Sequence, residues 1–190
     1  MQGGEEARSE TYLDVRCNDE RRSQRRRWAF FSSLLGCEAV VESIRDWRRA
    51  QAIRPSVSAV IWRGGRLLLQ QRADGGQWGL PGGSVEIGET VTHAISREVR
   101  EETGLEVQRG RLIGVYSDPA FQVVQYPDGQ VWHYVNLCFE CTILDGTLTT
   151  SDETLALDFF SPSELPPTLV PLHKIRIEDA LTSRLEPFIR

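Results

Sequence analysis

The chain has 190 residues, which is enough for one domain of ordinary core size plus an extension. It is 40% hydrophobic and 26% charged, with a formal net charge of −5, a balance typical of a soluble globular protein. This acidic balance argues against binding of a nucleic-acid polymer, which needs a basic face, but it is compatible with a small nucleotide substrate. No apolar run reaches the roughly 20 residues of a transmembrane helix, so no membrane partner is expected.

Residues 1–54 are predicted to form an N-terminal extension. Residues 1–27 are polar and rich in arginine, which is typical of a loosely attached arm. The apolar stretch 28–37 resembles a short signal peptide that ends in a cysteine, but it lies after the long polar arm, so we expect a cytoplasmic protein. Apolar residues at helical spacing predict an amphipathic helix over 38–50, which ends before Pro55. This helix would pack on the same chain or on a second copy in a homodimer.

The pattern after Pro55 changes to that of β-strands. Residues 56–62 and 66–71 predict two strands, and the pair Gly64-Gly65 predicts the turn between them. Further strands are predicted over 106–116, 131–144 and 157–160, with a closing helix over 171–181. Strands and helices in this order predict an α/β domain over 55–190, with a mixed sheet between helices.

Two of the four cysteines lie in one predicted strand with C-x-x-C spacing. Cys138 and Cys141 are three positions apart, and residues three apart on a strand face opposite sides of the sheet. They should therefore not share a metal ion, and no second pair has zinc-finger spacing. Reduced thiols in a cytoplasm are expected.

The segment between the second and third strands predicts a glycine-rich loop followed by a helix. Gly82 and Gly83 permit positive φ and a close approach of the backbone to a ligand. Thr90 is a candidate N-cap, and Gly104 is a candidate C-terminal stop. Val91, Ala94, Ile95 and Val99 form an apolar stripe that should bury one face of the helix, so we expect its glutamates to point the other way.

Three carboxylates lie on that helix at spacings of three and four residues. Glu98, Glu101 and Glu102 therefore share one face. Like charges at these spacings weaken a helix by roughly 0.2–0.5 kcal/mol per pair, and a divalent cation would reverse the effect. Carboxylate oxygens are hard ligands that suit Mg²⁺ or Mn²⁺.

The residues from Gly83 to Leu105 resemble the signature of the Nudix hydrolases, G-x5-E-x7-R-E-U-x-E-E-x-G-U, in which U is aliphatic. Its nine specified positions are filled by Gly83, Glu89, Arg97, Glu98, Val99, Glu101, Glu102, Gly104 and Leu105. The resemblance covers about residues 55–185. It implies a Nudix-type α/β/α sandwich, to which the sequence pattern of residues 1–54 adds an N-terminal helical extension. It also implies an enzyme that cleaves the pyrophosphate bond of a nucleoside diphosphate linked to another group.

The resemblance also implies roles for individual residues. Glu98, Glu101 and Glu102 would be metal ligands, with the main-chain carbonyl of Gly82 or Gly83 as an additional one. Arg97 would pair with Glu89 and brace the loop against the helix, and Glu86 is a candidate for a further metal or for contacts around the ligands. The general base is Glu101 or Glu102 on the helix, or an acid on a downstream loop, for which Glu153 and Asp158 are the candidates.

The substrate is less strongly indicated than the reaction. Pro119 lies fourteen positions after Leu105, and ADP-ribose-cleaving members of the family are similar in this respect. We therefore expect ADP-ribose or a nucleotide sugar, with a nucleoside triphosphate of the MutT type or a non-catalytic nucleotide sensor as alternatives. The aromatic and polar candidates for base recognition are Tyr116, Phe121, Tyr126, Trp132, His133 and Tyr134.

Overall fold

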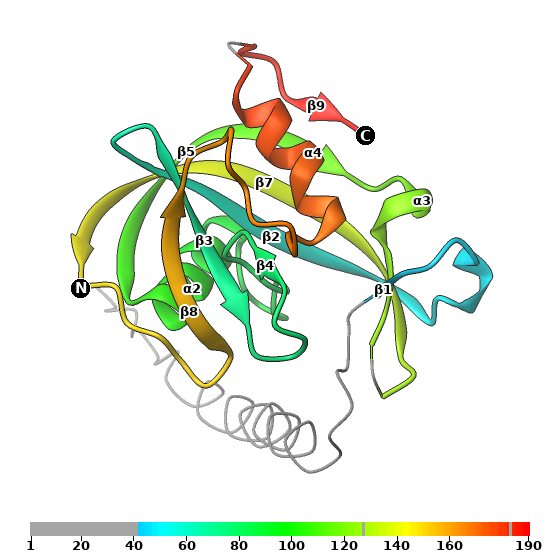
Figure 1. Cartoon of the computed structure of the whole chain (residues 1–190). Helices are drawn as coiled ribbons and strands as arrows, with labels where there is room; N and C mark the ends of the chain where they lie inside the picture. The colour runs from blue at the N-terminus through cyan, green and yellow to red at the C-terminus, as the bar shows by residue number, and fades with distance from the viewer. Residues whose placement is uncertain (1–41, 127, 183) are drawn as a thin grey trace, which may run out of the picture. The chain divides into compact units, whose positions relative to one another are not determined.

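The computed structural model describes residues 42–126, 128–182 and 184–190 (Figure 1). The predicted polar arm at 1–27, the apolar stretch at 28–37 and the first residues of the predicted helix over 38–50 lie outside the described residues. The division into an extension at 1–54 and a domain at 55–190 stays a prediction.

The predicted amphipathic helix is wrong for residues 42–50. This stretch forms a short strand, β1 (Glu42–Ser43), and one turn of 3₁₀ helix, η1 (Trp47–Arg49). Strand β1 pairs with β6 (Val123–Gln125), and the Ile44 amide donates to the Val123 carbonyl at 2.9 Å. Pairing with a sheet edge uses backbone groups that a helix would need for itself, so the helical spacing of the apolar residues is overridden here.

A mixed sheet forms the centre of the domain. Strand β2 (Ala52–Arg63) runs parallel to β7 (Val131–Gly146) and antiparallel to β3 (Arg66–Arg72). On the far side of β7 lies β5 (Leu105–Tyr116), and on the far side of β3 lies β8 (Thr154–Phe160), both antiparallel to their neighbours. The short strands β4 (Trp78–Gly79) and β9 (Phe188–Ile189) pair with β3 and β5. The predicted mixed sheet is confirmed.

Helices cover both faces of this sheet. Helix α2 (Val91–Thr103) packs on one face, in a core that includes Ile95, Val99 and Phe139. Helix α4 (Pro171–Ala180) packs on the other face, in a core that includes Leu69 and Ile177, and Figure 1 shows the two helices on either side of the strands. This is the predicted α/β/α sandwich. Cys138 belongs to the α4 side and Cys141 to the α2 side, as expected from their spacing.

Both predicted ends of α2 are confirmed. The Thr90 hydroxyl accepts a hydrogen bond from the His93 amide at 3.1 Å, which caps the first turn. Gly104 follows the last turn with φ of 73°, and its amide donates to the Arg100 carbonyl. A Cβ at this position would lie 2.5 Å from the Thr147 carbonyl oxygen, so glycine is required both for φ and for space.

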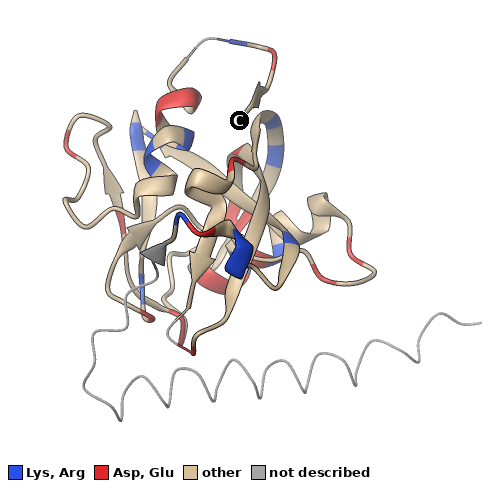
Figure 2. Cartoon of the chain, turned by 90° about the vertical axis from the view of Figure 1, so that its right-hand side faces the viewer, with Lys and Arg blue, Asp and Glu red and all other residues tan. Residues whose placement is uncertain are grey.

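The charged residues are spread over several elements. Figure 2 shows lysines and arginines interspersed with aspartates and glutamates on the strands, helices and loops in that view. Among the described residues, none of the helices has the length and apolar character needed to cross a bilayer.

Candidate active site

The loop that precedes α2 runs alongside β2 and is held to it by its backbone. The Ala59 amide donates to the Pro81 carbonyl and the Val57 amide to the Gly83 carbonyl, each at 2.8 Å. Between these two contacts, the Gly82 amide donates to Glu102 Oε2 at 2.7 Å. The loop therefore joins the central sheet to the glutamate face of α2.

Gly82 and Gly83 allow this close approach. Gly82 has φ of 145°, and a Cβ there would lie 2.2 Å from the Val57 carbonyl oxygen. A Cβ at Gly83 would lie 2.6 Å from the carboxylate of Glu98. The first glycine is needed for contact with β2, and the second makes room for a carboxylate. The predicted positive φ is found at Gly82 only, and the predicted approach to a ligand stays a prediction.

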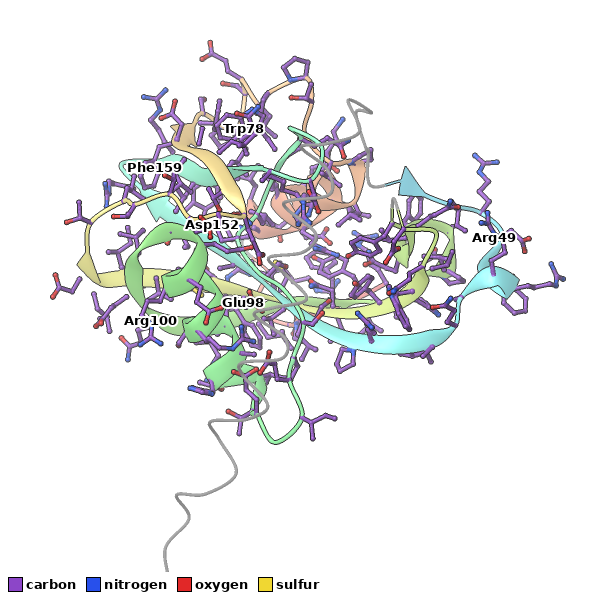
Figure 3. The ribbon with its side chains drawn as sticks, turned by 90° about the horizontal axis from the view of Figure 1, so that it is seen from below. Arg49, Trp78, Glu98, Arg100, Asp152 and Phe159 are labelled. Carbon is purple, nitrogen blue, oxygen red and sulfur yellow. The ribbon has the colours of Figure 1, made fainter. Side chains whose placement is uncertain are left out.

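Two of the three predicted glutamates are buried. Glu98 is 2% exposed and Glu102 is 7% exposed. The expectation that the glutamates point away from the apolar stripe is wrong for both residues. Glu98 is four positions after Ala94 and Glu102 is seven positions after Ile95, so both carboxylates share the buried face of α2, where the Gly82-Gly83 loop lies against them. In Figure 3, Glu98 lies on the inner side of α2 and Arg100 on its outer side.

The two buried carboxylates disfavour each other's charge. Burial and the nearby charge of Glu98 raise the pKa of Glu102 to about 8, against hydrogen bonds from Gln70 and the Gly82 amide and the positive charge of Arg72. A carboxylate whose charge is destabilised by burial and by a second carboxylate is a good ligand for a cation, which reverses both effects. The chemistry of this pair fits a divalent metal ion.

Glu101 is placed differently from its two neighbours. Its side chain is 44% exposed, and its carboxylate pairs with Arg97 Nη1 at 3.2 Å. Among the described residues, no group of three or more histidine, cysteine, aspartate or glutamate side chains is gathered closely enough to hold a metal ion. The structure thus brings Glu98 and Glu102 together in the interior and leaves Glu101 at the rim of the candidate site, partly exposed to solvent.

Arg97 ties the loop to α2. Its Nε and Nη2 donate to the two carboxylate oxygens of Glu89 at 2.8 and 2.9 Å, which is the pair expected from the sequence. Its Nη2 also donates to the Ser84 carbonyl at 3.1 Å, and its Nη1 lies 2.8 Å from Glu98 Oε1. Glu89 in turn accepts from the Glu86 amide at 3.1 Å. Protein groups therefore surround the guanidinium of Arg97, and these contacts hold the loop against α2.

The downstream acids lie on and before β8. Glu153 is exposed on a turn whose backbone is attached to the end of β3, since the Ala73 amide donates to the Glu153 carbonyl at 3.0 Å. Strand β8 contacts α2, and Figure 3 shows Asp152, the residue before Glu153, in this turn. Asp158 is exposed within β8, and its carboxylate accepts from the Phe159 amide at 2.7 Å. Asp158 thus lies within β8 and bonds the backbone of its own strand, whereas Glu153 lies on the turn before that strand.

The aromatic candidates for base recognition have different surroundings. Tyr116 is buried in the core and its hydroxyl donates to Asp179 at 3.0 Å, so it is a core residue. The hydroxyls of Tyr126 and Tyr134 bond each other at 2.8 Å. The other three candidates are His133, which contacts the Ser117 carbonyl, Trp132, which lies under Arg54, and Phe121, which is exposed. Pro119 is the first residue of the short helix α3 (Pro119–Gln122).

His173 is a site-supporting residue that the sequence did not reveal. It lies on the inner face of α4, and its Nδ1 accepts from the Leu80 amide at 3.1 Å, two residues before Gly82. The sequence signal for its burial was its position four residues before Ile177, because residues four apart share one face of a helix. Burial, followed by the charges of Arg176 and Arg72, holds the pKa of His173 well below its ordinary value.

This low pKa predicts acid sensitivity. Below about pH 6.5 the unfolded chain protonates His173 but the folded chain does not, so folding loses up to about 1.4 kcal/mol per pH unit as the pH falls. We expect His173→Gln, whose amide oxygen can still accept from Leu80, to lose less stability than wild type between about pH 6.5 and about pH 5. Urea denaturation at several pH values measures this, and parallel curves for the two proteins would contradict it.

Comparison with known proteins identifies the family. The sequence profile of the NUDIX domain matches residues 52–180. A MutT-like protein of Streptomyces ambofaciens is 38% identical over 127 residues, which are 66% of this chain and 75% of the relative. An ADP-ribose pyrophosphatase of Methanocaldococcus jannaschii is 36% identical over 114 residues, 58% of this chain and 63% of the relative. The crystal structure of a UDP-X diphosphatase superposes with a TM-score of 0.61 at 26% identity, over 89% of this chain and 83% of the other.

The matched residues include the glycine-rich loop, α2 and the strands that hold them, so the likeness covers the candidate site as well as the sheet. Together with the α/β/α fold, these matches show that the chain belongs to the Nudix hydrolase family.

Proposed function

We propose that this chain hydrolyses a pyrophosphate bond in a nucleoside diphosphate linked to another group, with Mg²⁺ or Mn²⁺ as cofactor. The observation that carries the proposal is the pair of buried carboxylates, Glu98 and Glu102, under the Gly82-Gly83 loop. Buried like charges are costly for a fold, and they persist where a cation is needed. A bound divalent ion would neutralise phosphate oxygens and acidify a water molecule.

The proposed ligands are the carboxylates of Glu98 and Glu102, a carbonyl of the loop, and Glu101. Of the two loop carbonyls, that of Gly83 already accepts from the Val57 amide, so the Gly82 carbonyl is the better candidate. Glu101 lies at the rim with Arg97, where it can approach a ligand that enters from solvent. Arg97 keeps its bracing role, because Glu89 and Ser84 already occupy its donors.

We propose Glu153 as the general base, since it is an acid on a turn that is fixed to the end of β3 and precedes a strand in contact with α2. Replacing it with Gln should lower kcat by about 10²-fold, the lower end of what a general base contributes. Asp152→Asn is the matched control, because Asp152 is the exposed neighbour on the same turn. Equal kcat values for the Glu153→Gln and Asp152→Asn variants would leave the base role to Glu101 or Glu102.

The proposed substrate is ADP-ribose or a nucleotide sugar, and a nucleoside triphosphate is the second candidate. The names of the relatives support both, since one is an ADP-ribose pyrophosphatase and one is a MutT-like protein. A homodimer and a cytoplasmic location, both expected from the sequence, stay predictions.

The test is turnover of a substrate panel by the purified full chain. ADP-ribose, nucleotide sugars and nucleoside triphosphates are incubated with Mg²⁺, and products are resolved by chromatography. We expect nucleoside monophosphate from the linked diphosphates at a higher kcat/KM than from the triphosphates. The reverse ranking would favour the triphosphate function, and binding of nucleotide without any product would favour a sensor.

A further inference from the structure

Arg176 places a buried guanidinium on the inner face of α4. The residue is 3% exposed, and its Nη2 donates to Gln122 Oε1 at 2.9 Å, a buried contact between α4 and α3. Its Nε is buried and has no hydrogen-bond partner among the described residues. A buried donor without a partner destabilises a fold, so this N–H indicates an acceptor that the described part of the chain does not supply.

The guanidinium of Arg176 is held from two sides. Gln122, which is also 3% exposed, takes one of its amino groups. Its Cζ lies 5.5 Å from the centroid of the Tyr116 ring, within the range of a cation–π contact. These two contacts fix the plane of the guanidinium, so its unpaired N–H keeps one direction before any ligand binds.

His173 adds a second donor on the same face of α4, one turn before Arg176. Its Nδ1 accepts from the Leu80 amide at 3.1 Å, and since a backbone N–H only donates, Nδ1 carries no proton. The proton of the neutral ring is therefore on Nε2. A Cβ on Gly79 would lie 3.3 Å from this atom, so the ring edge faces the glycine, and among the described residues none accepts the Nε2 proton.

These donors keep a fixed place beside the glycine-rich loop. The segment that leads into α4 is paired with β4, since the Trp78 amide donates to the Thr168 carbonyl at 3.0 Å and the Val170 amide to the Trp78 carbonyl at 2.8 Å. The Leu80 amide, which donates to His173, belongs to the residues that enter the loop. A nucleotide whose pyrophosphate lies at the loop can therefore extend its base toward α4.

The surroundings of the two donors are apolar and aromatic. Leu80 and Ile177 belong to one apolar core, and Trp78 packs against it. A flat heterocycle with polar atoms on one edge suits such surroundings better than a phosphate group, whose charge is costly to bury. The donors on α4 therefore favour the base of the nucleotide over its phosphates.

Two donors side by side discriminate between kinds of base. A 6-oxo purine presents the acceptors O6 and N7 on one edge, and a uracil presents O4. Adenine presents N7 together with an amino group, which would meet the N–H of Arg176 or His173 donor to donor. That arrangement leaves a buried N–H without an acceptor, which is costly.

We propose that Arg176 and His173 are specificity residues that bind the acceptor edge of an oxo base. Linked diphosphates of guanine, hypoxanthine or uracil are then better substrates than those of adenine. This inference rests on the proposed function and narrows its substrate, since it ranks nucleotide sugars with an oxo base above ADP-ribose.

The test compares two substrates that differ only in the group that the donors would meet. ADP-ribose and its deaminated form, IDP-ribose, are hydrolysed by the purified full chain with Mg²⁺, and kcat/KM is measured for each. We expect kcat/KM to be about 10-fold higher for IDP-ribose, as one well-placed pair of hydrogen bonds to a base gives. Equal values, or a preference for ADP-ribose, would overturn the inference, and this comparison needs no variant to fold.

A variant tests whether Arg176 carries the preference. Arg176→Met has a similar length and no donors, so the two kcat/KM values should become nearly equal. A purely structural role would change stability and both values alike, so an unchanged preference in the folded variant would overturn the assignment. Lys174→Met, at a side chain of α4 that is 68% exposed, is the matched control and should keep the wild-type preference. If wild type hydrolysed neither substrate, the proposed function itself would fail, whereas hydrolysis of both with equal kcat/KM would overturn this inference alone.

Discussion

Glu102→Gln is expected to lower kcat by about 10³-fold, because it removes a ligand from a site that supplies several kcal/mol of transition-state stabilisation. The glutamine can still accept from the Gly82 amide, so the loop should keep its position. The measurement is the steady-state rate with Mg²⁺ on the best substrate of the panel. A rate close to that of wild type would remove Glu102 from the proposed ligands.

The same substitution, which should lower the rate, should raise the thermal stability of the metal-free protein at alkaline pH. In the metal-free protein the pKa of Glu102 is raised from 4.5 to about 8, so between these values the folded chain binds more protons than the unfolded chain. The contribution of protonated Glu102 to folding stability is complete below pH 4.5 and is lost as the pH rises through about 8. The Glu102→Gln variant cannot ionise here, so in EDTA at about pH 9 it should melt at a higher temperature than wild type.

Magnesium should reverse this order of stability. A ligand that binds only the folded state at about 100 times its Kd adds about 2.7 kcal/mol, so wild type should gain a clear increase in Tm. The Glu102→Gln variant should gain little. Differential scanning fluorimetry with EDTA and with Mg²⁺ measures both shifts, and an equal magnesium shift in the two proteins contradicts the assigned ligand role.

Gly82→Ala is the second change with a large expected effect. The new Cβ would lie 2.2 Å from the Val57 carbonyl oxygen, and φ of 145° is a conformation that L-residues rarely adopt. The loop must move away from β2, and it then loses its contact with Glu102. Displacement of a catalytic group by about 1 Å can cost about 10²-fold in rate, and the strain itself costs about 1–3 kcal/mol. We expect both losses, which steady-state kinetics and urea denaturation measure.

Gly88→Ala is the matched control in the same loop. Gly88 also has a positive φ, of 85°, but a Cβ there meets nothing within 4 Å. This variant should lose stability through backbone strain and keep its rate. If both variants lost activity equally, backbone strain alone would explain the effect of Gly82→Ala, and the tight contact with β2 would have no special part in catalysis.

The main helix and the positions of the longer strands along the chain were predictable because their signals are local. The ends of α2 are set by Thr90 and Gly104 and its buried face by the apolar stripe, all within a few residues of one another. The alternating or apolar runs of β2, β3, β5 and β7 are equally short-range signals. The spacing of Cys138 and Cys141 on one strand was also sufficient to place them on opposite faces.

The features that were not predictable depend on contacts between distant segments. The helical period alone places Glu98 and Glu102 on the face of Ala94 and Ile95, but the Gly82-Gly83 loop that encloses the carboxylates is positioned by pairing with β2, which no local signal shows. His173 gains its role from the Leu80 amide, 93 residues away. Residues 42–50 have helical spacing, but an available sheet edge at β6 decides their structure.

The most direct measurement is Mn²⁺ titration of wild type and of the Glu98→Gln, Glu102→Gln double variant, followed by electron paramagnetic resonance. If the buried pair holds the catalytic ion, wild type binds Mn²⁺ saturably and hydrolyses its substrate only when metal is present, and the folded double variant does neither. Undiminished Mn²⁺ affinity in the double variant, or undiminished hydrolysis by wild type in EDTA, would contradict the account.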